Sequence, residues 1–348
     1  MNEMKLRRRA TINDVAAAAG VTKATVSLTL SGKRQPSPET RDAILRAAHD
    51  LGYEPNPNAR SLATGRRDTT VGLFALYLDF GVATHKIGII QSRLGAQGFQ
   101  VPLYTGGYGQ NIGKPAQIAL LREVLRSRPR AIICHTEILN PETRQDLKRF
   151  QEEGGFVVGY DYPDMLDCDQ VILDREDNTY QAARHLLEGG HRRIGFYLPG
   201  PLKPGHPREV GFRRALAEFD AAVEERWIFH GGEYMEGGAR LASAFLALSD
   251  RPTAMCIVND EAAAAFIAEI GRNGLRVPEN VSVVSHDDIA IARYSPVRLT
   301  AVSHPVEAIA QTVVDLMLDR LTERFTGPAR RVFVRGKLTI RESSRTLS

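Results

Sequence analysis

The sequence of 348 residues is long enough for two or three domains of ordinary size. Hydrophobic residues make up 43% of the chain and charged residues 25%, a composition that excludes a disordered or fibrous protein. The formal net charge of +4 is unevenly spread: residues 1–67 carry 12 Lys and Arg against 6 Asp and Glu, and the remainder carries 33 against 35. A small basic segment joined to a near-neutral body is typical of a nucleic-acid-binding module attached to another domain, although a basic tail without a partner gives the same charge.

The N-terminal residues do not read as a secretion signal. Lys5 and the arginines at 7–9 are followed by Thr11-Ile12-Asn13-Asp14, whereas a signal needs an apolar run of about 7–15 residues at this point. No later segment reaches the roughly 18 uninterrupted apolar residues of a membrane span. We therefore expect a cytoplasmic protein with no membrane partner.

The cysteines and glycines carry no recognisable cofactor or metal motif. Cys134, Cys168 and Cys256 are far apart and odd in number, so we expect them to be core residues in a reducing compartment. The chain contains no GxSxG, P-loop, HExxH or GxGxxG motif, and the glycine cluster at 106–109 is expected to form a turn. The sequence predicts no cofactor and no metal.

Three short helices are predicted in the basic segment. Thr11 is a suitable cap for the first helix, with Asp14 in its first turn and Gly20 as its end. Thr22 is a suitable cap for a second helix over about 23–31. Ser37-Pro38-Glu39 begins a third helix, for which Ile44, Leu45, Ala48 and Leu51 form the expected apolar stripe.

The first two helices have the form of a helix-turn-helix. Gly20 makes the tight turn, and Val26 is expected to fill the small core. The second helix would then present Lys23, Ala24 and Leu28 among its outward residues to base edges in a major groove. A purely structural helix pair shares this spacing, and the third helix and the basic charge favour DNA binding.

Residues 55–67 allow two interpretations. Pro55 and Pro57 end the third helix, and residues 58–64 could form about two helical turns, too few to be stable alone in water. The segment is either a solvated linker or a hinge helix that folds on DNA, with Leu62 as an apolar wedge in the minor groove.

The stretch Thr11-Ile12-Asn13-Asp14-Val15-Ala16 followed by Ala19-Gly20-Val21-Thr22 and Thr25-Val26-Ser27 resembles the N-terminal signature of the LacI/GalR family of bacterial transcription regulators. The segment from Tyr53 to Leu62 resembles the hinge of that family. The resemblance implies that DNA contacts come from Thr11, Thr22, Lys23, Ala24, Thr25, Ser27, Leu28, Ser31, Thr40, Asn56, Ala59, Arg60 and Leu62. Leu28 departs from the arginine common in the family, so we expect an atypical operator half-site that Lys23 and Ala24 help to read.

After Arg67, apolar runs alternate with amphipathic stretches, which predicts an α/β body with doubly wound parallel sheets in two lobes. The expected strands are 71–78, 101–104, 131–134, 156–160, 194–198, 254–258, 281–285 and 299–302. The expected helices are 83–97, 115–127, 141–153, 176–189, 207–220, 236–248, 260–273 and 305–324. Ligands bind at the carboxyl ends of the strands in sheets of this kind.

The order of these elements resembles the periplasmic-binding-protein-like effector domain of the same family over residues 70–345, with Arg341–Ser344 similar to its closing strand. The local marks are Arg208-x2-Gly211-Phe212, Val258-Asn259-Asp260, the run Val283 to Asp288, and Tyr160-Asp161. The resemblance implies an effector site formed by Asp161, Arg208, Tyr234, Asn259, Asp287, His304 and His135.

Each of these residues also has a structural alternative. Arg208 could form a surface salt bridge, Asn259 could cap a helix, Tyr234 could be a core residue, and Asp260 is expected to cap the helix at 260–273. Carboxylates, an amide, an arginine and an aromatic face together suit a sugar or similar polyol, and a purine-like or acidic effector is the alternative.

Two other classes of function would be compatible with parts of this sequence. Asp287, Asp288 and His286 could be catalytic, but neighbouring residues on a strand face opposite sides and do not converge on one reacting centre, so we expect no enzyme. A transport receptor could use the same body, and the missing signal and the basic head oppose it.

The sequence thus predicts a small all-α helix-turn-helix head at 1–54, a hinge at 55–67 and a two-lobed effector-binding and dimerisation domain at 68–348. We expect a cytoplasmic, nucleoid-associated homodimer that binds a near-palindromic double-stranded operator and a sugar-like effector. A repressor is favoured over an activator.

Overall fold

The computed structural model describes residues 11–30, 36–51, 53, 69–75, 78, 81–105, 114–200, 204–232 and 234–347. By contacts the chain divides into two units, residues 1–69 and residues 70–348.

Unit 1 is formed by the helices α1 (Ile12–Ala19), α2 (Lys23–Leu30) and α3 (Pro38–Asp50). Thr11 and Asp14 form a capping box at the start of α1, and Gly20 ends that helix with a left-handed φ of 65°, which glycine adopts without strain. Thr22 accepts a hydrogen bond from the backbone N–H of Thr25, and Ser37 caps α3 next to a proline in its first turn. The predicted caps are confirmed.

A small apolar core holds the three helices together. Its members are Val15, Ala16, Val26, Ile44 and Ala48, and Val26 and Ile44 are completely buried. The predicted stripe on α3 is only half correct, because Leu45 and Leu51 are exposed by 45% and 41%. One short helix presents about a third of its circumference to a core this small, so the outer residues of a wide stripe stay in water.

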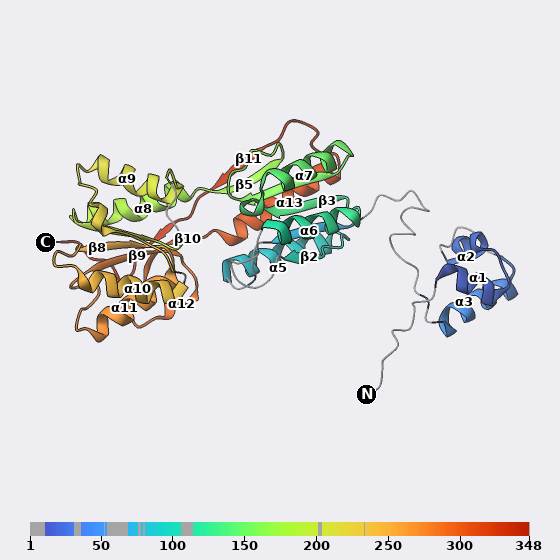
Figure 1. The fold of residues 1–348 in the computed structure, drawn as a ribbon, viewed down its shortest axis with the longest axis horizontal. Helices are drawn as coiled ribbons and strands as arrows, with labels where there is room; N and C mark the ends of the chain where they lie inside the picture. Colours follow the sequence, from blue (N-terminus) through green and yellow to red (C-terminus); the bar gives the residue numbers. More distant parts are fainter. Residues whose placement is uncertain are drawn as a thin grey trace. The chain divides into compact units, whose positions relative to one another are not determined.

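Unit 2 consists of two α/β lobes, each with a six-stranded sheet (Figure 1). Lobe 1 has the strand order β11-β5-β4-β3-β1-β2, and its strands are all parallel. Its strands are β1 (Val71–Ala75), β2 (Leu103–Thr105), β3 (Ala131–His135), β4 (Phe156–Asp161), β5 (Asp169–Leu173) and β11 (Arg331–Val334). Its helices are α5 (Gly81–Ala96), α6 (Lys114–Arg126), η1 (Thr136–Ile138), α7 (Pro141–Glu152) and α13 (Val306–Leu321).

Lobe 2 has the order β12-β10-β9-β8-β6-β7, and β12 runs antiparallel to β10 at one edge. Its strands are β6 (Ile194–Leu198), β7 (Ile228–His230), β8 (Ala254–Ile257), β9 (Ser282–Asp287), β10 (Thr300–Ser303) and β12 (Leu338–Thr339). Its helices are α8 (Arg175–Glu188), α9 (Pro207–Glu218), η2 (Glu225–Trp227), α10 (Tyr234–Ala247), α11 (Asp260–Arg272) and α12 (Ala290–Tyr294). The predicted fold class is confirmed.

Alternate residues of each central strand enter two separate cores. In β3, Ala131 and Ile133 pack with α5 and α13, whereas Ile132 and Cys134 pack with α6 and α7. In β8, Met255 packs with α10 and α11, and its neighbours pack with α8 and α9. Helices on both faces explain why these strands read as continuous apolar runs, since each face of the pleat is buried.

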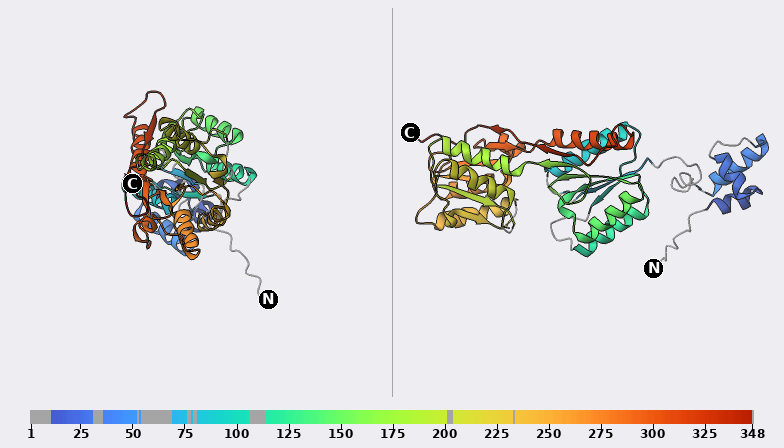
Figure 2. Two further views of the ribbon diagram at one scale, coloured as in Figure 1. Left: turned by 90° about the vertical axis from the view of Figure 1, so that its left-hand side faces the viewer. Right: turned by 90° about the horizontal axis from the view of Figure 1, so that it is seen from above.

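The chain passes between the lobes three times, after β5, after β10 and after β11. The last third of the chain, coloured orange to red, therefore contributes to both lobes: α13 lies in lobe 1, and the C-terminal residues lie in lobe 2 (Figures 1 and 2). Asp169 at the start of β5 accepts hydrogen bonds from Arg320 of α13 and from Arg330 before β11, and these contacts fasten the returning segment to lobe 1.

Several predicted elements differ in the structure. The first strand ends at Ala75 rather than at Leu78, and β5, β7, β11 and α12 were not predicted. The predicted closing strand Arg341–Ser344 is wrong, because only Leu338 and Thr339 pair with β10. Residues 341–344 instead turn along β9, where Ser343 bonds both to Val283 and to the backbone of Thr300.

Candidate functional site

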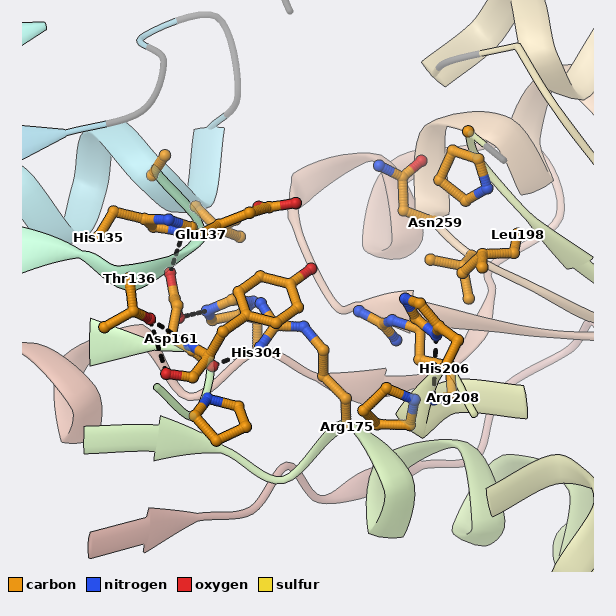
Figure 3. A pocket seen from close by; sticks show the side chains of 18 of the residues that line it. His135, Thr136, Glu137, Asp161, Arg175, Leu198, His206, Arg208, Asn259 and His304 are labelled. Carbon is orange, nitrogen blue, oxygen red and sulfur yellow. Dashed lines mark hydrogen bonds and ion pairs between the residues drawn. The ribbon is translucent and has the colours of Figure 1, made fainter. Parts of the chain in front are cut away.

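A cavity of about 620 Å³ lies between the two lobes of unit 2 (Figure 3). All seven residues that the sequence predicted for an effector site line it: His135, Asp161, Arg208, Tyr234, Asn259, Asp287 and His304. Three of them end strands, because Asp161, His135 and Asp287 are the last residues of β4, β3 and β9. The site follows from the parallel sheets, whose carboxyl ends face each other across the cleft.

Asp161 is the centre of a charged cluster on the lobe 1 side. Its Oδ2 bonds to the ammonium of Lys86 and lies 3.1 Å from Nε2 of His135, and Lys86 Nζ also lies 3.1 Å from Nε2 of His304. Burial opposes ionisation of Asp161, but Lys86 and His135 outweigh burial and hold the pKa of this carboxyl well below its usual range. The site therefore contains an ionised carboxylate that is surrounded by cationic and hydrogen-bond-donating groups.

Asp287 supplies a second carboxylate from lobe 2. It is 7% exposed, and its Oδ1 lies 3.6 Å from Nδ1 of His304. Burial opposes ionisation here too, but His304 and Arg208 lower the pKa of Asp287 below its ordinary value. Ionised carboxylates only accept hydrogen bonds, so Asp161 and Asp287 suit the hydroxyl groups of a ligand.

Four residues that line this cavity each have one buried polar atom that makes no hydrogen bond to any residue that the structure describes. These atoms are Nδ1 of His135, Oδ1 of Asp161, Nε of Arg175 and Nη1 of Arg208. Unsatisfied buried polar atoms are rare in folded proteins, since each one loses its bonds to water without a replacement. Their concentration around one cavity indicates a site that is completed by a bound molecule.

The backbone at the site is strained at three of the predicted residues. Asp161, Tyr234 and Asp287 have φ values of 82°, 48° and 103°, a region that side chains other than glycine rarely adopt. Strain of this kind persists only where the surroundings enforce it, and it gathers at binding sites. It aims the two carboxylates away from their own strands and into the cavity.

Asn259 has a double role, and the predicted helix cap is wrong. Its side chain, not that of Asp260, caps α11 by accepting a hydrogen bond from the N–H of Ala262 at 3.1 Å, while Asn259 also lines the cavity. Asp260 is fully buried and instead bonds to Ser285 Oγ and to the N–H of Ile289. A carboxyl so far from water has its pKa raised well above the ordinary value by burial.

Sequence reasoning missed Lys86, Arg175 and His206, which also line the cavity. Lys86 lies on the apolar stripe of α5 with Val82 and Ile90, and a lysine at such a position is a signal that the sequence offered. His206 caps α9 by accepting from the N–H of Arg208, and Arg175 opens α8. Nothing in the local sequence shows that these two residues face the cavity.

The side chains of His286, Asp287 and Asp288 diverge, as strand geometry predicted. Asp287 faces the cavity, Asp288 bonds to Arg341, and His286 is buried against Thr179. These three residues do not share one centre.

In unit 1, α2 presents the residues that the sequence assigned to DNA. Lys23, Ala24 and Thr22 are exposed, and Thr25, Ser27 and Leu28 are half-buried. The hydroxyl of Thr11 donates to Asp14 in the capping box, and that of Thr40 lies 2.8 Å from Ser37 Oγ, so both also serve helix starts. The predicted contacts Ser31, Asn56, Ala59, Arg60 and Leu62 lie outside the described residues.

No helix in the described part of the chain is long and apolar enough to cross a membrane. Cys134, Cys168 and Cys256 are buried and unbridged, so their predicted place in the core is confirmed.

Comparisons with known proteins give both units a family. The model described as bacterial regulatory proteins, lacI family, matches residues 11–56, and that of the periplasmic binding protein-like domain matches residues 183–344. The HTH-type transcriptional regulator GalS of Salmonella typhimurium is 33% identical over 319 residues, covering 88% of this chain and 89% of the relative. The HTH-type transcriptional repressor PurR of Pectobacterium carotovorum is 31% identical, covering 90% and 91%.

Solved structures agree with these relatives. The transcriptional regulator CelR in complex with cellobiose is 28% identical, with a TM-score of 0.68 and coverage of 97% of this chain and 100% of that chain. The lac repressor dimer bound to operator and the anti-inducer ONPF has the same fold, with 24% identity, a TM-score of 0.74 and the same coverage. The chain therefore belongs to the lacI family of bacterial regulatory proteins, and it is a DNA-binding transcription regulator rather than an enzyme, as the sequence predicted.

Proposed function

We propose that this regulator is a repressor whose affinity for its operator is controlled by a sugar or sugar derivative bound between the two lobes of unit 2. The observation that carries the proposal is that four residues lining one cavity of about 620 Å³ each have an unsatisfied buried polar atom. A cavity of this size suits a small molecule of one or two rings.

The effector-binding residues in this proposal are His135, Asp161, Arg208, Tyr234, Asn259, Asp287 and His304, joined by Lys86 and Arg175. Asp161 and Asp287 would accept hydrogen bonds from ligand hydroxyls, and the arginines would donate to ligand oxygens. The half-buried ring of Tyr234 would cover an apolar face of the ligand. The cellobiose complex of CelR, a relative of the same fold, supports a sugar as the ligand.

For DNA binding, we propose the head at 1–54, the hinge at 55–67 and the body at 68–348 as the working domains of a cytoplasmic, nucleoid-associated homodimer. The exposed face of α2, with Lys23 and Ala24, would read a half-site in the major groove. Leu62 from each subunit would open the central step of the operator from the minor groove. The two-fold symmetry of such a dimer would match a near-palindromic site. The lac repressor, which has the same fold, was solved as a dimer on its operator.

The control mechanism would use the three crossings between the lobes. A ligand that binds both Asp161 in lobe 1 and Asp287 in lobe 2 favours the lobe arrangement that brings these carboxylates to its hydroxyls. Through the dimer, a change in lobe arrangement alters the spacing of the two hinges and thereby the affinity for operator.

The proposal is tested with the full-length protein and DNA from upstream of its own gene. Fluorescence anisotropy at about 50 and 200 mM salt should show sequence preference and a steep loss of affinity with salt, and no binding at either concentration would contradict it. A thermal-shift screen of sugars, sugar phosphates and purines identifies the effector, because a ligand at 100 times its Kd adds about 2.7 kcal/mol to stability.

Asp287→Ala should keep operator binding and lose the response to the identified effector. Asp167→Ala removes an exposed carboxylate outside the cavity and should respond like the natural protein. An Asp287→Ala variant that is folded and responds normally would remove this residue from the site.

A further inference from the structure

Two buried arginines of lobe 2 enter the cavity from the first turns of two helices. Arg175 is the first residue of α8, and Arg208 is the second residue of α9, and the two are 7% and 8% exposed. Both project into the same pocket (Figure 3). The helix dipole makes the first turn of a helix a favourable place for negative charge, so a cation there adds positive potential to a positive end.

Each of these two guanidinium groups has at least one N–H donor without a hydrogen-bond partner among the described residues. Arg175 donates through Nη1 to the backbone oxygen of Asp161 and lies over the ring of Tyr162, with its Cζ 3.6 Å from the centroid. These contacts fix the group in place and leave Nε without a partner among the described residues. Within the same described part of the chain, the guanidinium of Arg208 donates to no acceptor, and its Nη1 is fully buried.

The acidic residues beside the two helix starts do not neutralise these arginines, because they pair with other arginines outside the cavity. Asp174 and Asp177 contact Arg335 at 3.0 and 4.0 Å, and Glu209 contacts Arg213 at 2.7 Å. Glu176 likewise pairs with Arg214 at 2.5 Å. None of these four carboxylates lines the cavity.

Inside the cavity, the other cations already have carboxylates. Lys86 pairs with Asp161, and Arg144 forms a bidentate ion pair with Asp164, with N–O distances of 2.6–3.0 Å. Two buried arginines then remain beside one buried carboxylate, Asp287, and one exposed carboxylate, Glu137. Asp287 forms no ion pair within 4.0 Å with either arginine in the described structure. Burial and the nearby charge of Arg175 lower the pKa of Arg208 to about 10, so Arg208 stays charged at neutral pH and is repelled by the guanidinium of Arg175.

We propose that the effector carries an anionic group, a carboxylate or a phosphate, that binds to both Arg175 and Arg208. Its hydroxyl groups then face Asp161 and Asp287. The planar guanidinium fork matches carboxylate and phosphate oxygens, and an anion between two arginines removes their repulsion while supplying the missing acceptors. This inference rests on the proposed function, and it narrows the ligand from neutral sugars to sugar acids or sugar phosphates.

The test measures binding of inorganic phosphate and of acetate to the full-length protein by thermal shift, against sodium chloride of equal ionic strength. At least one of the two anions should give a saturable rise in Tm beyond that of chloride, and the anion with the larger rise distinguishes a phosphate from a carboxylate. Arg175→Gln should weaken this binding by about tenfold or more, because it removes a charged donor and keeps a side chain of similar length.

Arg184→Gln is the matched control, since Arg184 lies on the same helix, is exposed, and pairs with Glu188. This variant should bind the anion like the natural protein. Any anion bound by the basic head would contribute equally to the natural protein and to both variants, so only a loss specific to Arg175→Gln reports on the cavity. Should Arg175→Gln not fold, Arg208→Gln tests the second guanidinium in the same way.

No excess rise with either anion, or equal binding in the natural protein and a folded Arg175→Gln or Arg208→Gln variant, would overturn the inference. Operator binding is measured separately by anisotropy. Loss of the anion effect with normal operator binding contradicts only the anionic ligand, whereas absent operator binding contradicts the proposed function itself.

Discussion

His286 is a buried histidine whose two ring nitrogens have different partners. Nδ1 lies 3.4 Å from the backbone oxygen of Ile257, and Nε2 lies 3.3 Å from the hydroxyl of Thr179. A carbonyl only accepts, so Nδ1 carries the proton and Nε2 accepts from the threonine. Burial lowers the pKa of His286 to about 3, and the ring is neutral in the folded protein.

This histidine predicts an acid-sensitive fold. In the unfolded chain its pKa is about 6.5. As the pH falls from 6.5 toward 3, His286 becomes protonated in the unfolded chain but stays neutral in the folded protein. The free energy of unfolding therefore decreases. Urea unfolding at pH 7 and pH 5 should show that the natural protein loses about 2 kcal/mol more than His286→Gln over this interval. Equal losses in both proteins would contradict the assignment.

Lys23 gives a prediction for DNA recognition. It is exposed at the first position of α2, where a helix in the major groove presents its side chains to base edges. Lys23→Ala should lower affinity for the operator more than affinity for a scrambled duplex, as measured by anisotropy at one salt concentration. Lys148→Ala, an exposed lysine of α7 in unit 2, is the control and should change neither. Equal loss on both duplexes would assign Lys23 to phosphate contact alone.

At the residue scale, the sequence predicted those site residues that lie at the ends of strands. Asp161, Asn259 and Asp287 follow apolar runs, and the end of a buried strand is a position that sequence patterns reveal. Arg208 and Tyr234, which helices supply, were predicted only through the family resemblance, whereas Arg175 and Lys86 lie on helices outside its motifs and were missed. The direction of a side chain on a helix depends on how that helix packs against its neighbours, which one sequence does not state.

Among the elements, the helix pairs on the faces of lobe 2 approach closely because glycines lie between them. A Cβ at Gly211 of α9 would lie 2.0 Å from the backbone oxygen of Glu176 in α8, and one at Gly238 of α10 would lie 2.1 Å from that of Ala262 in α11. The glycine in the segment Arg208-x2-Gly211-Phe212 therefore serves packing, which positions Arg208 at the cavity.

Two glycine substitutions should have opposite effects. Gly211→Ala places a methyl group against backbone and should destabilise the protein by about 2 kcal/mol, the usual cost of overpacking. Gly271 is an exposed position of α11, and a Cβ there would have nothing within 4 Å, so Gly271→Ala should stabilise the protein by up to about 1 kcal/mol through helix propensity. Thermal unfolding of the two variants decides this, and a neutral Gly211→Ala would mean that α8 and α9 separate easily.

The element pattern explains which strands the sequence missed. β5 begins with two buried polar residues, Asp169 and Gln170. The side chain of Gln170 bonds to the nearby backbone of Asp164 and Leu166, whereas the partners of Asp169 are distant arginines. Asp169 meets Arg320, which follows it by 151 residues. The strand at 341–344 was expected from the family resemblance, and this prediction is wrong because these residues bond to β9 through a turn rather than a ladder. Long-range partners decide both cases, and local patterns do not contain them.

For the whole molecule, the cleft and the DNA-binding head are coupled only if a ligand distinguishes two arrangements of the lobes. Asp161 and Lys86 belong to lobe 1, Asp287 belongs to lobe 2, and His304 lies on the crossing after β10 and contacts both carboxylates. A ligand held by this set touches both lobes and one of their connections, which is the geometry that such discrimination needs.

Coupling of this kind is reciprocal, which gives a measurable equality. If the effector changes operator affinity by some factor, saturating operator should change effector affinity by the same factor, because both describe one thermodynamic cycle. Calorimetric titration of the identified effector, with and without operator duplex, measures the second factor. A scrambled duplex is the control and should leave effector affinity unchanged. The single thermodynamic cycle would be excluded if the effector changed the affinity for operator while saturating operator left the affinity for the effector unchanged.

The three crossings also set the order in which the protein can be completed during synthesis. Lobe 1 begins first, at β1, yet one face of its sheet is covered by Ile309, Val313 and Met317 of α13, which are translated after most of lobe 2. The first lobe to leave the ribosome is therefore among the last parts to finish, and until α13 arrives its strands carry an open apolar face. The nascent chain is most exposed to aggregation and to chaperones in that interval, and a chain that stops after β10 leaves lobe 1 permanently unfinished.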